Sequence, residues 1–210
     1  MAQEGEEEDN IVKVILVGES NVGKTSLINV FLTGKFEEKV MNTTSASCIH
    51  KKLTTDISSY SIMMWDTAGQ EKFRSINKIF IKESKIVIFV YDIIRRSTFE
   101  EIPWWVNYVK ELLGDEAIFG LVGNKADLFD KEEEIKEQKK EFDLVDKKEA
   151  SNYAEQIGAL FIETSAKEDS KGFNQFITKI VKEYEKLKKP KKRSSFSLKK
   201  TKIKEKRKCC

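Results

Sequence analysis

Short apolar runs alternate with stretches of helical periodicity along most of the chain. Runs rich in Val, Ile and Phe predict strands, whereas apolar residues spaced three and four apart predict amphipathic helices. This alternation is typical of an α/β domain, and we expect a doubly wound, mainly parallel sheet of about six strands flanked by about five helices. The strands are expected at Ile11–Val17, Ile49–Thr54, Ser59–Trp65, Ile86–Asp92, Ala117–Gly123 and Ala159–Ile162, and four of the helices at Lys24–Leu32, Thr98–Leu113, Lys147–Ile157 and Gly172–Leu187.

Length and composition fit one cytosolic domain. The chain has 210 residues, of which 40% are hydrophobic, enough for a single core. Its longest wholly apolar run, Ile86–Tyr91, is far shorter than the ~20 residues of a membrane-spanning helix. The first ten residues carry five acids and no base, the opposite of a secretory or mitochondrial leader. The three cysteines do not make a disulfide framework.

Charge is distributed unevenly along the chain. Residues 190–210 hold ten Lys or Arg and one Glu, a net charge of +9, so that −6 remains for residues 1–189 of a chain with a total of +3. Apolar periodicity ends at Pro190, and we expect disorder beyond it. We therefore divide the chain into an acidic extension (1–10), one globular domain (11–189) and a basic tail (190–210). Such a tail suits an anionic surface.

Residues 18–25 read GESNVGKT and fit the phosphate-loop pattern G-x-x-x-x-G-K-[ST], between an expected strand and an expected helix. The first amides of a helix have no partner within the helix and carry partial positive charge, so they can surround a polyphosphate. Lys24 would add charge at the terminal phosphates, and the Thr25 hydroxyl suits Mg²⁺, which prefers oxygen. The residues assigned to the phosphates are Gly18, Ser20, Asn21, Val22, Gly23, Lys24, Thr25 and Ser26.

A second segment, WDTAGQE at residues 65–71, ends another apolar strand. Its carboxylate, Asp66, can reach a metal from the carboxyl edge of the sheet and is assigned to the magnesium site. Gly69 has no side chain, so its amide can approach a γ-phosphate closely. Gln70 has both a donor and an acceptor with which to align a water for in-line attack.

The string NKAD at residues 124–127 follows a further strand. Asp127 supplies two carboxylate acceptors that suit the N1 and N2 donors of guanine, an edge that adenine lacks, so this residue favours a guanine binder over an ATP-using kinase. Lys125 can lay its methylene stem along the base. The strand end ETSAK (163–167) offers amides to the guanine oxygen. The residues assigned to the base are Asn124, Lys125, Asp127, Ser165, Ala166 and Lys167.

The order GESNVGKT, WDTAGQE, NKAD, ETSAK resembles the Ras superfamily of small GTPases, and the flanking SIMMWDTAGQEKFRS, VYDIIRRSTFEEI and terminal Cys-Cys resemble the Rab family. The resemblance covers residues 12–187 and the terminus. It implies a P-loop small GTPase fold and a slow GTPase that uses GTP, GDP and Mg²⁺ to control vesicular membrane trafficking. Gln70, Lys24 and Thr43 would be catalytic, and nucleotide-dependent loops would lie around residues 36–47 and 69–78.

Within the first of these loops, the family has an aromatic residue on the guanine and, seven residues later, a threonine on Mg²⁺. Phe36 and Thr43 have that separation, although Thr44 competes if the register slips by one. Two positions depart from the family pattern. Cys48 replaces an aromatic residue that faces effectors. Asn21 stands where many relatives have a small residue, and we expect it to tolerate left-handed backbone there.

The pair Cys209-Cys210, at the end of the basic tail, resembles a double geranylgeranylation site. Two lipid anchors with a polybasic segment hold a protein on a membrane firmly. The resemblance implies a monomer on the cytosolic face of intracellular membranes, with an activating protein, an exchange factor, a GDP-dissociation inhibitor and effectors as partners. Nucleic acid is not expected, because no aromatic residues are interleaved for base stacking. The alternatives are a Ras-like signalling GTPase and a scaffold that holds GTP without hydrolysing it.

Overall fold

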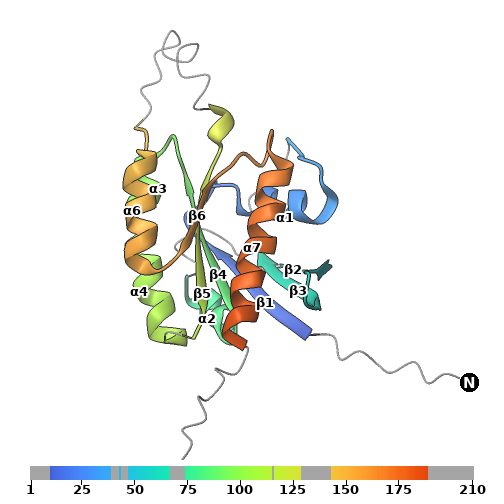
Figure 1. Cartoon of the computed structure of the whole chain (residues 1–210). Coiled ribbons are helices and arrows are strands. Elements are labelled where there is room, and N and C mark those ends of the chain that lie inside the picture. Colours follow the sequence, from blue (N-terminus) through green and yellow to red (C-terminus); the bar gives the residue numbers. More distant parts are fainter. Residues whose placement is uncertain are drawn as a thin grey trace, which may run out of the picture.

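The computed structural model describes residues 10–38, 43, 47–66, 74–114, 116–128 and 143–188. For residues 74–77 and 170 it describes the backbone alone. One sheet runs through the middle of the molecule (Figure 1). Its strands are β1 (Asn10–Val17), β2 (Ser47–Thr54), β3 (Ser59–Asp66), β4 (Ile86–Asp92), β5 (Ile118–Asn124) and β6 (Leu160–Glu163). The helices are α1 (Lys24–Thr33), α2 (Arg74–Ile81), α3 (Arg96–Glu100), α4 (Ile102–Leu113), α6 (Lys147–Ile157) and α7 (Ser170–Lys188), with a 3₁₀ turn, η2 (Ala126–Leu128).

The strand order is β2-β3-β1-β4-β5-β6. The edge strand β2 pairs antiparallel with β3, and each of the other neighbouring pairs is parallel. All seven residues of β4 are buried, as expected for a central strand with helices on both faces. The six-stranded, mainly parallel sheet confirms the fold expected from the hydrophobic pattern.

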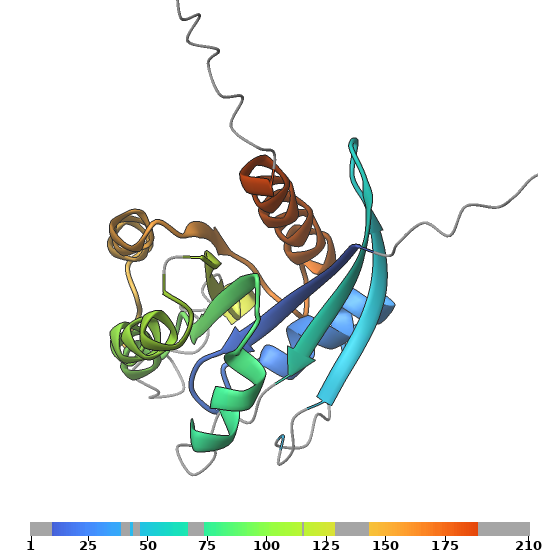
Figure 2. The same ribbon diagram turned by 90° about the horizontal axis from the view of Figure 1, so that it is seen from below.

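Different helices cover the two faces of the sheet (Figures 1 and 2). Successive side chains of a strand point to opposite faces, so Ile88 packs in a core with α1 and α7, whereas its neighbours Val87 and Phe89 pack in a second core with α4 and α6. This arrangement is doubly wound. The carboxyl ends of the parallel strands therefore meet at one edge of the sheet, where open α/β sheets bind their ligands.

Two sequence-based expectations need correction. The single helix expected at 98–113 is two helices, α3 and α4, with Glu101 between them. Pro103 at the start of α4 explains the break, because proline has no N–H to donate to Phe99 and its ring would clash with that carbonyl. In addition, residues 74–78 of the second expected loop belong to the helix α2. None of the helices in the described ranges is both long and apolar enough to cross a membrane.

The highly charged stretch 128–148 connects the turn η2 to α6. Residues 129–142 of it lie outside the described residues. Its end is well packed: Val145 is buried in the second core and its amide donates to the carbonyl of Ile93. Asp146 then caps α6 by accepting from the amide of Glu149 at 2.9 Å. This end of the segment is therefore fixed against the loop that follows β4.

Candidate functional site

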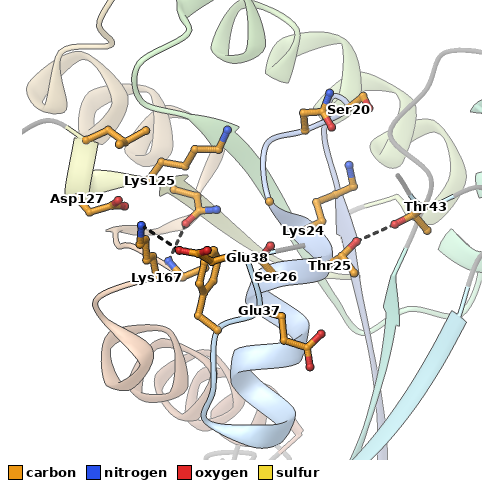
Figure 3. A pocket seen from close by; sticks show the side chains of 16 residues that line it. Ser20, Lys24, Thr25, Ser26, Glu37, Glu38, Thr43, Lys125, Asp127 and Lys167 are labelled. Carbon is orange, nitrogen blue, oxygen red and sulfur yellow. Dashed lines mark hydrogen bonds and ion pairs between the residues drawn. The ribbon is translucent and has the colours of Figure 1, made fainter. Parts of the chain in front are cut away.

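A cavity of about 460 Å³ lies at the carboxyl edge of the sheet (Figure 3). Lys24 and Thr25 stand on one side of it, and Asp127 and Lys167 on the other. The cavity thus places the expected phosphate loop and the expected base motif around one space. Its lining is Ser20, Asn21, Gly23, Lys24, Thr25, Ser26, Phe36, Glu37, Glu38, Thr43, Asn124, Lys125, Asp127, Leu128, Ala166 and Lys167.

The loop between β1 and α1 has backbone conformations that bring its amides together. Gly18, Asn21 and Gly23 have φ values of 145°, 62° and 93°. A Cβ on Gly18 would lie 2.1 Å from the carbonyl oxygen of Val90, so only glycine fits there. Gly23 is the N-cap of α1 and, as a glycine, has no side chain with which to cap the helix, which leaves the first amides of α1 for a ligand.

Lys24 is buried, with 5% of its surface exposed. Its ammonium donates to the carbonyls of Gly18 at 2.9 Å and Glu19 at 2.8 Å. Burial lowers the pKa of Lys24 from 10.5 to about 8, against the opposing attraction of Asp66 and Glu19. A desolvated ammonium at a helix start is a strong site for an anion, because a bound phosphate restores the favourable interactions that burial removed.

Three oxygen atoms converge beside Lys24. The Thr25 hydroxyl lies 2.7 Å from the Thr43 hydroxyl (Figure 3) and donates to Asp66 Oδ2 at 2.7 Å. The Thr43 hydroxyl donates to the same carboxylate oxygen at 3.2 Å. Two hydroxyls and a carboxylate make a hard, all-oxygen set that fits Mg²⁺. The structure brings Thr43 into this set, whereas the competing Thr44 lies outside the described residues.

Opposite the phosphate loop, Asp127 is 8% exposed in the turn η2, which follows β5. Its Oδ1 accepts from the Ser165 hydroxyl at 2.6 Å, and the amides of Lys167 and Glu168 donate to that same hydroxyl. The loop after β6 therefore holds this carboxylate in place. One carboxylate with a fixed orientation can accept two parallel donors from a planar base.

Asn124 ties the two halves of the cavity together. Its amide nitrogen donates to the carbonyl of Val22 at 2.9 Å, and its amide oxygen accepts from the amide of Ala166 at 3.1 Å. The next residue, Lys125, has φ 71° and donates to Asp92 Oδ2 at 2.7 Å. The spacing of the phosphate loop relative to the base motif is thus set by side-chain bonds.

Most residues assigned to the site from the sequence line the cavity. Gly18, Val22 and Ser165 do not line it but bond to residues that do, and Asp66 contacts the cavity through Thr25. Gly69 and Gln70 lie outside the described residues, as do Cys209 and Cys210. Phe36 lines the cavity and is half-buried.

Sequence reasoning missed three lining residues, Glu37, Glu38 and Leu128. Glu38 lies 3.9 Å from the Lys167 ammonium, an ion pair across the mouth of the cavity (Figure 3). The only sequence signal for the two glutamates was their position directly after Phe36. Asp92 was also missed, although its place at the carboxyl end of β4 marked the right edge of the sheet.

Comparisons with known proteins agree with this geometry. Residues 13–186 match the sequence model of the Ras family. Ras-related protein Rab-21 of Bos taurus is 38% identical over 170 residues, which cover 81% of this chain and 71% of that protein. Ras-related protein Rab-21 of Homo sapiens is likewise 38% identical over 170 residues, covering 81% and 70%. Ras-related protein Rab-19 of Homo sapiens is 36% identical over 176 residues, covering 83% and 76%.

Proposed function

This chain belongs to the Rab family of the Ras superfamily, and from that premise we propose that the cavity binds GTP and GDP with Mg²⁺ and that the chain is a membrane-trafficking switch. Rab proteins are GTPases, so the reaction is hydrolysis of GTP. The observation that carries the proposal is a single cavity with a buried lysine at a helix start on one side and a buried, fixed carboxylate on the other.

The two sides of the cavity have different chemical tasks. The amides at the start of α1 and the Lys24 ammonium bind the phosphates, which carry the negative charge of the ligand. Asp127 accepts from the N1 and N2 donors of guanine, and Ser165 keeps the carboxylate in the orientation that this needs. Adenine has no matching pair of donors, so the buried Asp127 carboxylate would give up water without gaining hydrogen bonds from the base, a cost that disfavours adenine.

Thr25 and Thr43 would hold Mg²⁺ through their hydroxyls, with Asp66 close behind. When bound, the ion neutralises charge on the β- and γ-phosphates. Thr43 comes from the segment after Phe36, and Thr25 from α1. Hydrolysis would remove the γ-phosphate and release the contact between Thr43 and the metal, so the segment after Phe36 would be held only in the GTP-bound form. GTP and GDP would thus give partners different surfaces.

Gln70 is proposed to align the attacking water, and Gly69 to donate its amide to the γ-phosphate. We expect slow intrinsic hydrolysis, on the order of 10⁻⁴ to 10⁻² s⁻¹, because no arginine of the chain is assigned to the transition state. An activating protein would supply the acceleration, and an exchange factor would release GDP. Effectors would bind the GTP-bound form.

Single-turnover hydrolysis of GTP tests the enzymatic part of the proposal. Wild-type protein loaded with GTP and Mg²⁺ should release phosphate slowly, and Gln70→Leu should retain GTP affinity while losing most of that rate. Gln156→Leu, an exposed glutamine of α6 that does not line the cavity, is the matched control and should hydrolyse like wild type. Equal rates for Gln70→Leu and wild type would remove the role of Gln70, and no hydrolysis by wild type would favour a scaffold that only holds GTP.

The domain division and the tail belong to the same proposal. Residues 11–189 form the GTPase domain, and the basic tail 190–210 carries geranylgeranyl groups on Cys209 and Cys210 that place the chain on the cytosolic face of intracellular membranes. Lys and Arg near an anionic leaflet add about 1 kcal/mol each to this anchoring. The intact mass of the protein from a eukaryotic cell should show two lipid additions, lost in Cys209→Ser/Cys210→Ser. An unmodified terminus would contradict the anchor and leave the GTPase assignment standing.

A further inference from the structure

We propose that Arg95 is a positioning residue for the phosphate loop and that it slows the release of GDP. The proposal rests on the guanine-nucleotide site described above and adds to it a residue outside its sequence motifs. Arg95 directly precedes α3, and its Nη2 donates to the carbonyl oxygen of Ser20 at 2.8 Å. Seventy-five positions separate the two residues.

The phosphate loop needs partners for its carbonyl groups. When its amides turn toward a phosphate, its carbonyl oxygens turn outward, and each must accept a hydrogen bond or be solvated. Lys24 donates to the carbonyls of Gly18 and Glu19, and Asn124 to that of Val22. Ser20, midway along the loop, has Arg95. A charged donor makes a stronger bond to a carbonyl than a neutral one, so Arg95 holds the centre of the loop in place.

The backbone around Arg95 is firmly fixed. Its amide donates to the carbonyl of Asp92 at 3.0 Å, and its carbonyl accepts from both the amide and the hydroxyl of Thr98, at 3.0 and 2.7 Å. The amide of Arg96 donates to the carbonyl of Asp143 at 2.8 Å. The guanidinium therefore extends toward Ser20 from a rigid turn, and less freedom is lost when its bond forms.

Asp92 connects this contact to the base side of the cavity. Its carboxylate is 4% exposed, and its Oδ2 accepts from the Lys125 ammonium at 2.7 Å. The same oxygen lies 4.0 Å from Arg95 Nε. One buried carboxylate is thus shared by Arg95, which holds the phosphate loop, and by Lys125, which belongs to the base motif. Loss of Arg95 would loosen the loop and also leave Lys125 as the main cation beside Asp92.

Arg95 acts through the loop and does not touch the ligand. It is not among the described residues that line the cavity, and 41% of its side chain is exposed. Its removal should therefore change how tightly the loop retains a nucleotide and leave the hydrolysis step on bound GTP nearly unchanged. This split distinguishes a positioning residue from a catalytic one.

The neighbouring arginine provides a matched control. Arg96 makes a bidentate ion pair with Glu149, with N···O distances of 3.0 and 2.9 Å, and it does not contact the phosphate loop in the described structure. Full-length protein with Mg²⁺ and a fluorescent GDP analogue would be compared as wild type, Arg95→Ala, Arg95→Lys and Arg96→Ala. The measurements are the release rate of the analogue, the single-turnover rate with bound GTP and the unfolding midpoint.

We expect Arg95→Ala to release the GDP analogue about tenfold faster than wild type, ~1.4 kcal/mol in retention. Arg95→Lys should release the analogue at a rate between those of wild type and Arg95→Ala, because lysine keeps the charge and one donor. It also serves as the readout if the alanine variant does not fold. Arg96→Ala should release within twofold of wild type, and hydrolysis of bound GTP should stay within twofold in every variant. Release from Arg95→Ala at the wild-type rate, or equal acceleration in Arg96→Ala, would overturn the proposal. A wild-type chain that retains no GDP would overturn the nucleotide site itself.

Discussion

Gly23 and Gly34 flank α1, and both have positive φ, 93° and 73°. They differ in their surroundings. A Cβ on Gly23 would lie 2.2 Å from Asn124 Nδ2, whereas a Cβ on Gly34 would meet nothing within 4 Å. An L-residue in left-handed backbone costs ~1–2 kcal/mol at either position, but only at Gly23 does the new atom displace the asparagine that joins the phosphate loop to the base side.

We therefore predict that Gly34→Ala lowers the free energy of unfolding by ~1–2 kcal/mol, and that Gly23→Ala lowers it by more, because its Cβ also displaces the buried Asn124. Only Gly23→Ala should weaken GDP binding, by at least about tenfold, because Asn124 can no longer bond to Val22 without moving. Denaturant unfolding of nucleotide-free protein and titration with a GDP analogue measure the two effects. Equal GDP affinity in both variants would show that Asn124 does not set the spacing of the site.

The buried ammonium of Lys24 makes the stability of the empty protein depend on pH. Its pKa is about 8 in the folded chain and 10.5 in the unfolded chain, because burial disfavours the charged form. Between these values the unfolded state binds more protons, so the free energy of unfolding should rise as the pH increases from about 8 to about 10.5. The expected gain is on the order of 3 kcal/mol.

This rise should be seen in nucleotide-free, magnesium-free protein and should be missing in Lys24→Met, which has a side chain of similar length and no charge. Comparing the two proteins at each pH removes the contributions of all the other ionisable groups, which the two proteins share. Parallel pH dependences would mean that Lys24 is not desolvated in the empty site.

At the scale of single residues, the sequence predicts the residues of the motifs well and their long-range partners poorly. The left-handed backbone of Asn21 was expected, because asparagine tolerates it and the loop requires it. The bond from Arg95 to Ser20 and the bond from Lys125 to Asp92 were not expected. Each joins residues from different strand ends, and such pairs depend on the strand order, which periodicity alone does not give.

Among the elements, α6 shows how a local signal fixes a boundary. Its range, Lys147–Ile157, was predicted from periodicity, and the structure confirms it, with Asp146 as N-cap and Gly158 as a left-handed C-cap at φ 70°. The α3 and α4 pair shows the reverse, since an apolar stripe continuous over both helices concealed the break at Pro103. A stripe reports which face is buried, whereas caps and prolines report where the helix stops.

The cap can be tested separately from the site. Asp146→Ala should lower the free energy of unfolding by ~1 kcal/mol, because the Glu149 amide loses its acceptor. GDP affinity should not change, since α6 does not line the cavity. Lys148→Ala, an exposed change on the same helix, is the control and should stay within ~0.5 kcal/mol of wild type. Denaturant melts of the nucleotide-free proteins measure both, and equal stability of the two variants would refute the cap.

At the scale of the whole molecule, nucleotide binding and membrane binding belong to different parts of the chain. The proposed nucleotide site lies at the carboxyl edge of the sheet, whereas the +9 charge proposed to bind the membrane is in residues 190–210, which follow α7. The fold and the motif positions were predictable because a phosphate loop, a strand-end acid and a base motif all follow strands of one parallel sheet. The closeness of Thr43 to Thr25 was suggested by resemblance alone, because the hydrophobic pattern says nothing about the path of a segment between elements.

The central claim is that Lys24 and Asp127 bind opposite ends of one guanine nucleotide. Competition for a bound fluorescent GDP analogue, in the presence of Mg²⁺, tests it most directly, with GTP and ATP as competitors for wild type and Asp127→Ala. The account predicts that GTP displaces the analogue from wild type at concentrations at least ~10³-fold below those of ATP, and that the ratio falls toward one in Asp127→Ala. Equal displacement of the analogue from wild type by GTP and ATP would contradict it.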